Sequence, residues 1–155
     1  MSLLKNIKII DLTRFVAGPH CTLVLSDLGA EVIKVEKCNK GDDLRIIGPK
    51  LLHTSLWSAV LNRGKKSLSL NLKSVEGREI ILKLIKEADV LIENYKPKTL
   101  QSLGFSWKKI SKEFPKLVYA KISGFGETGP MSNLPAYDMV VQAMGGLMSI
   151  TGSSK

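Results

Sequence analysis

The chain has 155 residues, of which 44% are hydrophobic and 6% aromatic, and its formal net charge is +9 at pH 7. This composition suits about one globular domain with a real core and excludes a disordered chain. Cys21 and Cys38 are too few for a disulfide framework and lack metal-ligand spacing, and no apolar run approaches the roughly 20 residues of a membrane span.

We therefore expect a cytoplasmic protein with no metal and no membrane partner. The positive charge raises the alternative of nucleic-acid binding, which requires clustered basic residues. However, 19 of the 23 basic residues are lysines spread over the whole length. The densest pairs, Lys65-Lys66 and Lys108-Lys109, stand apart from any array of aromatic residues. A solvated lysine-rich surface explains the charge better, so we expect no nucleic-acid partner, although an anionic nucleotide ligand would also benefit from it.

The first part of the chain predicts two strands and a helix between them. Ile7 to Leu12 is a short β-branched run typical of a buried parallel strand. A helix follows, with Pro19 in its first turn, an apolar stripe that includes Val24 and Leu28, and Gly29 as its stop. Val32 to Glu36 reads as the second strand, and a loop rich in Gly, Asp and Pro extends from residue 38 to 49.

Further strands and helices alternate after this loop. Strands are predicted at Ser67 to Leu72, Val90 to Ile92 and Leu117 to Ile122. Between them lie a helix capped by Ser74, with Ile81 and Ile85 on its apolar face, and a short helix at Trp107 to Phe114 capped by Ser106. A glycine-rich loop from 124 to 130 then precedes one apolar helix from Met139 to Met148.

This alternation predicts an α/β fold, a Rossmann-like, mostly parallel sheet with helices on both faces. In such folds ligands bind at the carboxyl ends of the strands. Three segments lie there: residues 13–18, residues 93–95 and the loop at 124–129. None matches GxGxxG or GxxxxGK[ST], so a dinucleotide dehydrogenase and a P-loop enzyme are both disfavoured. The histidines, His20 and His53, stand near no GxSxG elbow, so a serine hydrolase is disfavoured too.

A series of blocks resembles the class III (family III) CoA-transferases. This family includes formyl-CoA, succinyl-CoA and carnitinyl-CoA transferases and α-methylacyl-CoA racemase. The resemblance begins with IKIIDLTRFVAGPHCTLVLSDLGAEVIKVE. The later blocks follow in the family's order: GDDLR, NRGKKSLSLNLKS, EGREI, ADVLIENYKP, LGFSW, PKLVYAKISGFGETGP and YDMVVQAMGGLMSITG. Because so many blocks occur in series over nearly the whole chain, the resemblance is specific.

The resemblance implies that residues 1–155 form the N-terminal CoA-binding part of the family's large domain, with the small domain and the rest of the enzyme absent from this sequence. It implies an interlocked homodimer of the full-length protein, or a C-terminal partner chain if the enzyme is split. The implied CoA contacts are Arg14, Phe15, Val16, Ala17, Lys37, Leu70, Asn94 and Tyr95. Lys37 and Ser102 depart from the family, because many members carry arginine at these positions.

The resemblance also implies the reaction. The family's transferases move CoA from an acyl-CoA to a carboxylic acid through an aspartate nucleophile, a form of covalent catalysis. Block order puts that aspartate beyond Lys155, so no catalytic residue is assigned in this sequence. Tyr137 and Asp138 fall in the acyl-site neighbourhood, with Asp138 at a helix N-terminus. Racemases of the family carry a histidine base where this chain has Tyr137, which favours a transferase.

Two other functions stay open. One is a non-catalytic CoA-binding or interaction module, and a weaker one is a basic nucleic-acid-binding α/β domain. The apolar face from Met139 to Met148 would lie uncovered in this piece alone, so we also expect marginal solubility.

Overall fold

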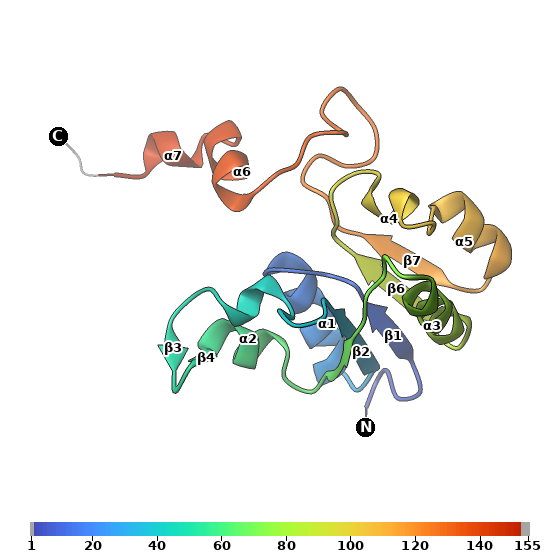
Figure 1. Cartoon of the computed structure of the whole chain (residues 1–155). Coiled ribbons are helices and arrows are strands. Elements are labelled where there is room, and N and C mark those ends of the chain that lie inside the picture. The colour runs from blue at the N-terminus through green and yellow to red at the C-terminus, as the bar shows by residue number, and fades with distance from the viewer. Residues whose placement is uncertain (1, 153–155) are drawn as a thin grey trace.

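The computed structural model describes residues 2–152, and its centre is a five-stranded parallel sheet (Figure 1). The strands are β1 (Lys8–Asp11), β2 (Glu31–Glu36), β5 (Lys66–Ser69), β6 (Val90–Glu93) and β7 (Val118–Lys121). Their order across the sheet is β5-β2-β1-β6-β7. The first strand in the chain therefore lies in the middle, the second and third lie to one side, and the fourth and fifth to the other, as in doubly wound Rossmann sheets.

The predicted strands form at the apolar runs, with ends that differ by at most three residues. Ile9 of β1 pairs with Val32 of β2 on one side and with Val90 of β6 on the other. The edge strand β5 is shorter than predicted, because the chain turns after Ser69. The N–H of Leu70 still donates to the carbonyl of Glu36 at 2.9 Å, but Ser74 already donates to Asn71 as the helix α3 begins.

Helices cover both faces of the sheet, which confirms the predicted fold class. On one face lie α3 (Val75–Lys86), α4 (Thr99–Ser102) and α5 (Trp107–Glu113). Ile81 and Ile85 of α3 pack there with Ile10 and Leu91 of the sheet. On the other face α1 (Ala17–Asp27) packs Cys21 and Leu25 against a smaller cluster that includes Ile9, Val32 and Ile92.

The predicted helix ends are present in the structure. The Ser74 hydroxyl accepts the N–H of Gly77 at 3.0 Å, and the Ser106 hydroxyl accepts that of Lys109 at 3.3 Å. Gly29 follows α1 with a φ of +99°, a left-handed conformation that suits glycine after a helix.

Between β2 and β5 the chain forms small elements where the sequence predicts a loop or no element. They are the 3₁₀ helix η1 (Asp43–Arg45), the hairpin strands β3 (Lys50–Leu51) and β4 (Thr54–Ser55), and the helix α2 (Leu56–Leu61). Each is too short to show a hydrophobic period, which is why composition alone does not reveal it.

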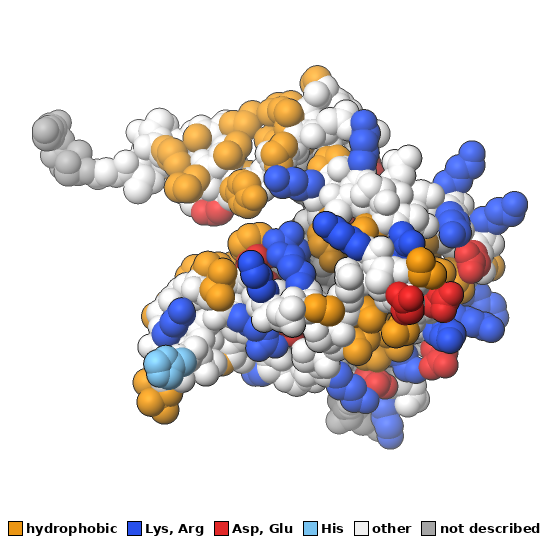
Figure 2. Space-filling view, in the orientation of Figure 1, with side chains coloured by type: hydrophobic (Ala, Val, Ile, Leu, Met, Phe, Trp, Pro, Cys, Tyr) orange, Lys and Arg blue, Asp and Glu red, His pale blue; other side chains and the backbone are white. Residues whose placement is uncertain are grey.

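The predicted single helix from Met139 to Met148 is wrong. The structure has two short helices, α6 (Asp138–Met144) and α7 (Leu147–Ile150), because Gly146 between them takes a φ of +78°. Both extend away from the sheet in Figure 1, and apolar side chains gather over them in Figure 2. Neither helix buries a residue. The apolar face is therefore exposed, as predicted, although it is built from two helices.

Candidate functional site

The candidate site lies where the loops after β1, β2 and β6 meet. β1 and β6 are neighbours in the sheet, but the strands that follow them lie on opposite sides. β2 and β5 extend the sheet beyond β1, and β7 extends it beyond β6, so the strand order reverses between β1 and β6. At such a switch point the loops diverge and leave a crevice at the carboxyl ends of the strands, where ligands bind in open α/β sheets. Most of the predicted CoA contacts fall in these loops.

Asn94 ties the two central loops together. Its side-chain carbonyl accepts the backbone N–H of Arg14 at 2.8 Å, and its amide group donates to the backbone carbonyl of Arg14 at 2.8 Å. A single side chain thus satisfies both backbone groups of a residue 80 positions away in the sequence. The Asn94 side chain is therefore engaged in holding the loop, so a ligand contact there would come mainly from the loop that it fixes.

Arg14 and Lys37 converge on one carboxylate. Nε of Arg14 donates to Asp43 Oδ2 at 2.8 Å, and a second guanidinium nitrogen contacts the same oxygen. Nζ of Lys37 lies 3.2 Å from Asp43 Oδ1. Burial alone would raise the pKa of Asp43, but hydrogen bonds and charges from Arg14 and Lys37 outweigh it and lower the pKa. Two cations and one anion leave an excess positive charge at this edge of the sheet, which suits a phosphate group.

The loop after β1 leads into an uncapped helix N-terminus. Phe15 has a φ of +60°, which is uncommon for a residue other than glycine. The Arg14 guanidinium lies 5.4 Å from the centre of its ring. Val16 is the N-cap of α1 and Ala17 its first residue, with no side-chain cap and no acidic residue in the first turn. Residues 16 and 17 are exposed, so their backbone N–H groups are available to an anion, whereas Gly18 is buried and Pro19 has no N–H.

Leu70 and Tyr95 belong largely to the core. Both side chains are partly buried against the larger hydrophobic cluster. Burial raises the pKa of Tyr95 to about 12 from its ordinary value of 10.0. The ligand contacts that the resemblance implies for these two residues remain predictions.

Tyr137 and Asp138 lie at the start of α6, the first as its N-cap and the second as its first residue. The predicted helix-terminal position of Asp138 is thus confirmed, and its carboxylate accepts a hydrogen bond from Gln142 at 2.5 Å. The Tyr137 ring makes an edge-on contact with Phe15, with the ring centres 6.4 Å apart. This contact brings the predicted acyl-site neighbourhood next to the loop after β1.

Charged residues that the sequence analysis did not select lie beneath this loop. They form a buried polar cluster of Asp11, Lys34, Asp42 and Lys65 with Thr13 and Thr22. Next to it, Glu36 accepts two hydrogen bonds from Arg45, both at 2.6 Å. A signal was present, because Lys34 and Glu36 stand inside a run that otherwise reads as a buried strand, and a buried charge needs a partner.

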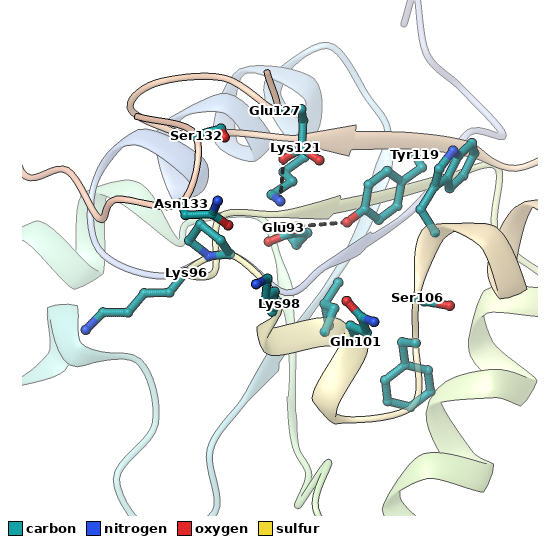
Figure 3. A pocket seen from close by; sticks show the side chains of 14 residues that line it. Glu93, Lys96, Lys98, Gln101, Ser106, Tyr119, Lys121, Glu127, Ser132 and Asn133 are labelled. Carbon is teal, nitrogen blue, oxygen red and sulfur yellow. Dashed lines mark hydrogen bonds and ion pairs between the residues drawn. The ribbon is translucent and has the colours of Figure 1, made fainter. Parts of the chain in front are cut away.

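A cavity of about 560 Å³ lies beside the crevice, between β6, β7, α4 and the loop at 127–133 (Figure 3). None of the predicted CoA contacts lines it, but Glu93 and Glu127 belong to the predicted ligand segments 93–95 and 124–129. Figure 3 shows the Glu93 carboxylate accepting a hydrogen bond from the Tyr119 hydroxyl, at 2.7 Å, and an ion pair between Lys121 and Glu127. Burial raises the pKa of Glu93 although Tyr119 and the N–H of Tyr95 both donate to it. This wall therefore holds an acid that binds its proton more tightly than usual.

Within residues 2–152, no group of three or more His, Cys, Asp or Glu side chains is placed to hold a metal ion. Over the same residues, no helix is both long and apolar enough to cross a membrane.

Comparison with known proteins identifies relatives over nearly the whole chain. The model of the family described as CoA-transferase family III matches residues 4–155. An acetyl-CoA:oxalate CoA-transferase from Acetobacter aceti is 48% identical over 144 residues, which are 93% of this chain and 37% of that protein. A succinyl-CoA:glutarate CoA-transferase from Homo sapiens is 46% identical over 150 residues, which are 96% of this chain and 34% of that protein.

A solved structure agrees with both. The crystal structure of a CAIB/BAIF family protein from Brucella suis superposes with a TM-score of 0.88 at 40% identity, over 96% of this chain and 40% of that one. The chain thus spans less than half the length of each of these relatives.

Proposed function

The chain belongs to CoA-transferase family III, and we propose that it supplies the CoA-binding part of an enzyme that transfers CoA from an acyl-CoA to a carboxylic acid. Two relatives support this reaction class, because their names describe CoA transfer involving oxalate and glutarate. The particular donor and acceptor acids are left open. The cytoplasmic location and the interlocked homodimer, or a C-terminal partner chain, remain predictions.

The observation that carries the proposal is the convergence of Arg14, Lys37 and the uncapped start of α1 at the switch point of the sheet. CoA carries a diphosphate and a 3′-phosphate, so it needs several positive or N–H donor groups along one edge. The planar guanidinium of Arg14 can donate two hydrogen bonds to a phosphate, and the ammonium of Lys37 can pair with one as a point charge. The exposed backbone N–H groups at the start of α1 can donate to a phosphate as well. Asp43 already pairs with both cations, so a phosphate must draw them away from it or share them.

The proposal assigns no catalytic residue within residues 1–155. Tyr137 and Asp138 are proposed to lie near the acyl group, and the contact between Tyr137 and Phe15 supports this position. Tyr137 can donate a hydrogen bond near the thioester, whereas a proton-abstracting base would be needed for racemisation. The tyrosine therefore favours transfer.

Calorimetric titration of the chain with CoA tests the binding part. We expect binding that weakens in Lys37→Ala and Arg14→Ala, and that is weaker for CoA lacking its 3′-phosphate. Lys86→Ala is the matched control, because Lys86 ends α3 near the amino ends of the strands, away from their carboxyl ends where the candidate site lies. Loss of CoA binding in the control and the site variants alike would contradict the site.

Transfer itself needs the full product of the gene, assayed with an acyl-CoA and a series of dicarboxylic acids. Formation of the new acyl-CoA supports the proposal. CoA binding without transfer for any acid would instead favour the alternative, a non-catalytic CoA-binding module.

A further inference from the structure

The Lys34 head group is buried beneath the candidate site. Its side chain is 1% exposed, in the middle of β2. Nζ donates to the backbone carbonyl of Thr13 at 2.8 Å and lies 2.9 Å from Asp42 Oδ2 and 3.8 Å from Asp11 Oδ2. Burial of a charged group costs several kcal/mol unless it is paired and hydrogen-bonded, so all three contacts are needed to keep it there.

Asp11 completes the cluster from the end of β1. One carboxylate oxygen accepts both the N–H of Thr13, at 2.8 Å, and the Thr13 hydroxyl, at 2.5 Å. The other accepts the Thr22 hydroxyl at 2.6 Å and Nζ of Lys65 at 3.3 Å. Burial lowers the pKa of Lys65, and the charge of Asp11 opposes that shift. Two lysines thus balance two carboxylates inside the protein.

Asp42 links this cluster to the ligand-facing loop. Its Oδ1 accepts the N–H of Phe15 at 3.2 Å and that of Leu44 at 3.0 Å. Its Oδ2 lies beside the Lys34 ammonium without forming a well-aligned hydrogen bond. The left-handed conformation of Phe15 is unfavourable for a residue other than glycine, so it needs support from outside the loop. The N–H bond to Asp42 and the fixed carbonyl of Thr13 supply that support on either side of Arg14.

The contacts of the cluster converge on the backbone of Thr13 and Phe15. An apolar filling of the same volume is often as stable as a buried ion pair, so stability alone is a weak reason for this arrangement. We infer that Lys34 and Asp42 are positioning residues, which hold Thr13 to Phe15 in the conformation that presents Arg14 and the start of α1 to a phosphate-bearing ligand. This inference rests on the proposed function for the identity of that ligand.

The test is the double variant Lys34→Met with Asp42→Asn in the full chain. It removes one positive and one negative charge, keeps the side chains close to their original size, and leaves Asp11 paired with Lys65. Loss of a charge-assisted hydrogen bond predicts about tenfold weaker CoA binding. It also predicts faster hydrogen exchange at the amides of residues 13–16. The matched control is Lys66→Met, which removes an exposed ion pair with Glu31, 2.6 Å long, in the same sheet.

The outcomes separate the inference from the proposed function. Weaker CoA binding with faster exchange confined to residues 13–16 supports positioning. If the wild type binds no CoA, the proposed ligand is refuted. Faster exchange confined to residues 13–16 in the double variant would still support positioning in that case. Unchanged exchange in the loop overturns the inference, and so does exchange that rises evenly over the sheet, because the cluster would then act only on global stability. If the double variant does not fold, Asp42→Asn alone, which keeps an acceptor for Phe15, is read by the same two measurements.

Discussion

Replacing Asn94 with alanine should loosen the site at its centre. The substitution removes both hydrogen bonds to the backbone of Arg14, each 2.8 Å long. A typical hydrogen bond contributes about 0.5–1.5 kcal/mol to stability, and water can replace part of these two because Asn94 is only partly buried. We therefore expect a loss of roughly 1–2 kcal/mol, which is about a 5- to 30-fold change in the unfolding equilibrium. Urea denaturation followed by circular dichroism measures it, together with weaker CoA binding.

Two further variants make this prediction specific. Asn94→Asp keeps an acceptor for the Arg14 N–H but places a second oxygen against the Arg14 carbonyl, so it should be at least as destabilising as alanine. Asn133→Ala changes an exposed asparagine and should alter stability by less than about 0.5 kcal/mol. If Asn94→Ala has the same urea midpoint and the same affinity for CoA as the wild type, the two loops are not held together by this amide and the reasoning fails.

Three other perturbations have defined outcomes. Burial alone would raise the pKa of Glu36, but hydrogen bonds, led by the one from Arg45, lower the pKa from 4.5 to about 2. The ionised Glu36 therefore stabilises the fold by an amount on the order of 3 kcal/mol above pH 4.5, and this stabilisation is lost as the pH falls towards 2. Urea titrations from pH 4.5 to 2 should show that the free energy of unfolding depends less on pH in Glu36→Gln than in the wild type. An equal pH dependence in the two proteins would contradict this prediction. Ser102→Arg introduces the arginine that the family resemblance implies at this position and should strengthen CoA binding by up to about fivefold, less at high salt; a salt-independent gain would count against an ionic contact. Gly18→Ala places a methyl group on the side chain of Thr13, so thermal unfolding should reveal a loss of about 1–3 kcal/mol, and an unchanged melting temperature would refute this close packing.

Local patterns in the sequence predict the strands and helices well where packing follows the local apolar period. The strand at β6 follows from its apolar run, and the caps at Ser74 and Ser106 follow from their residue types. The break at Gly146 does not, because glycine is tolerated within helices and only the backbone reveals its positive φ. The family resemblance correctly identifies the family. The structure brings Arg14 and Lys37 to the same carboxylate, with Phe15, Val16 and Ala17 following Arg14 at the start of α1.

The partners in the buried cluster could not be found in the same way. Lys34 inside an apolar strand indicates a buried charge that needs a partner, but only the three-dimensional structure places a threonine carbonyl and an aspartate from two different loops around it. The role of Asn94 in holding the Arg14 loop could not be predicted for a similar reason. Its partner, Arg14, lies 80 residues earlier, and no local pattern records that pairing.

The central position of β1 has a consequence for the order of folding. β1 precedes β6 in the chain, yet the two strands pair Ile9 with Val90, so β1 must wait until the roughly 80 residues between them have emerged from the ribosome. Closing such a long loop costs conformational entropy before the contacts between the strands form, so this parallel pairing is slow. Until then one edge of β1 has no strand to bond with, and the Arg14 loop has no asparagine to hold it. The site is therefore completed only after β6 has been made, and a synthesis intermediate that stops short of β6 lacks the Asn94 contacts to Arg14.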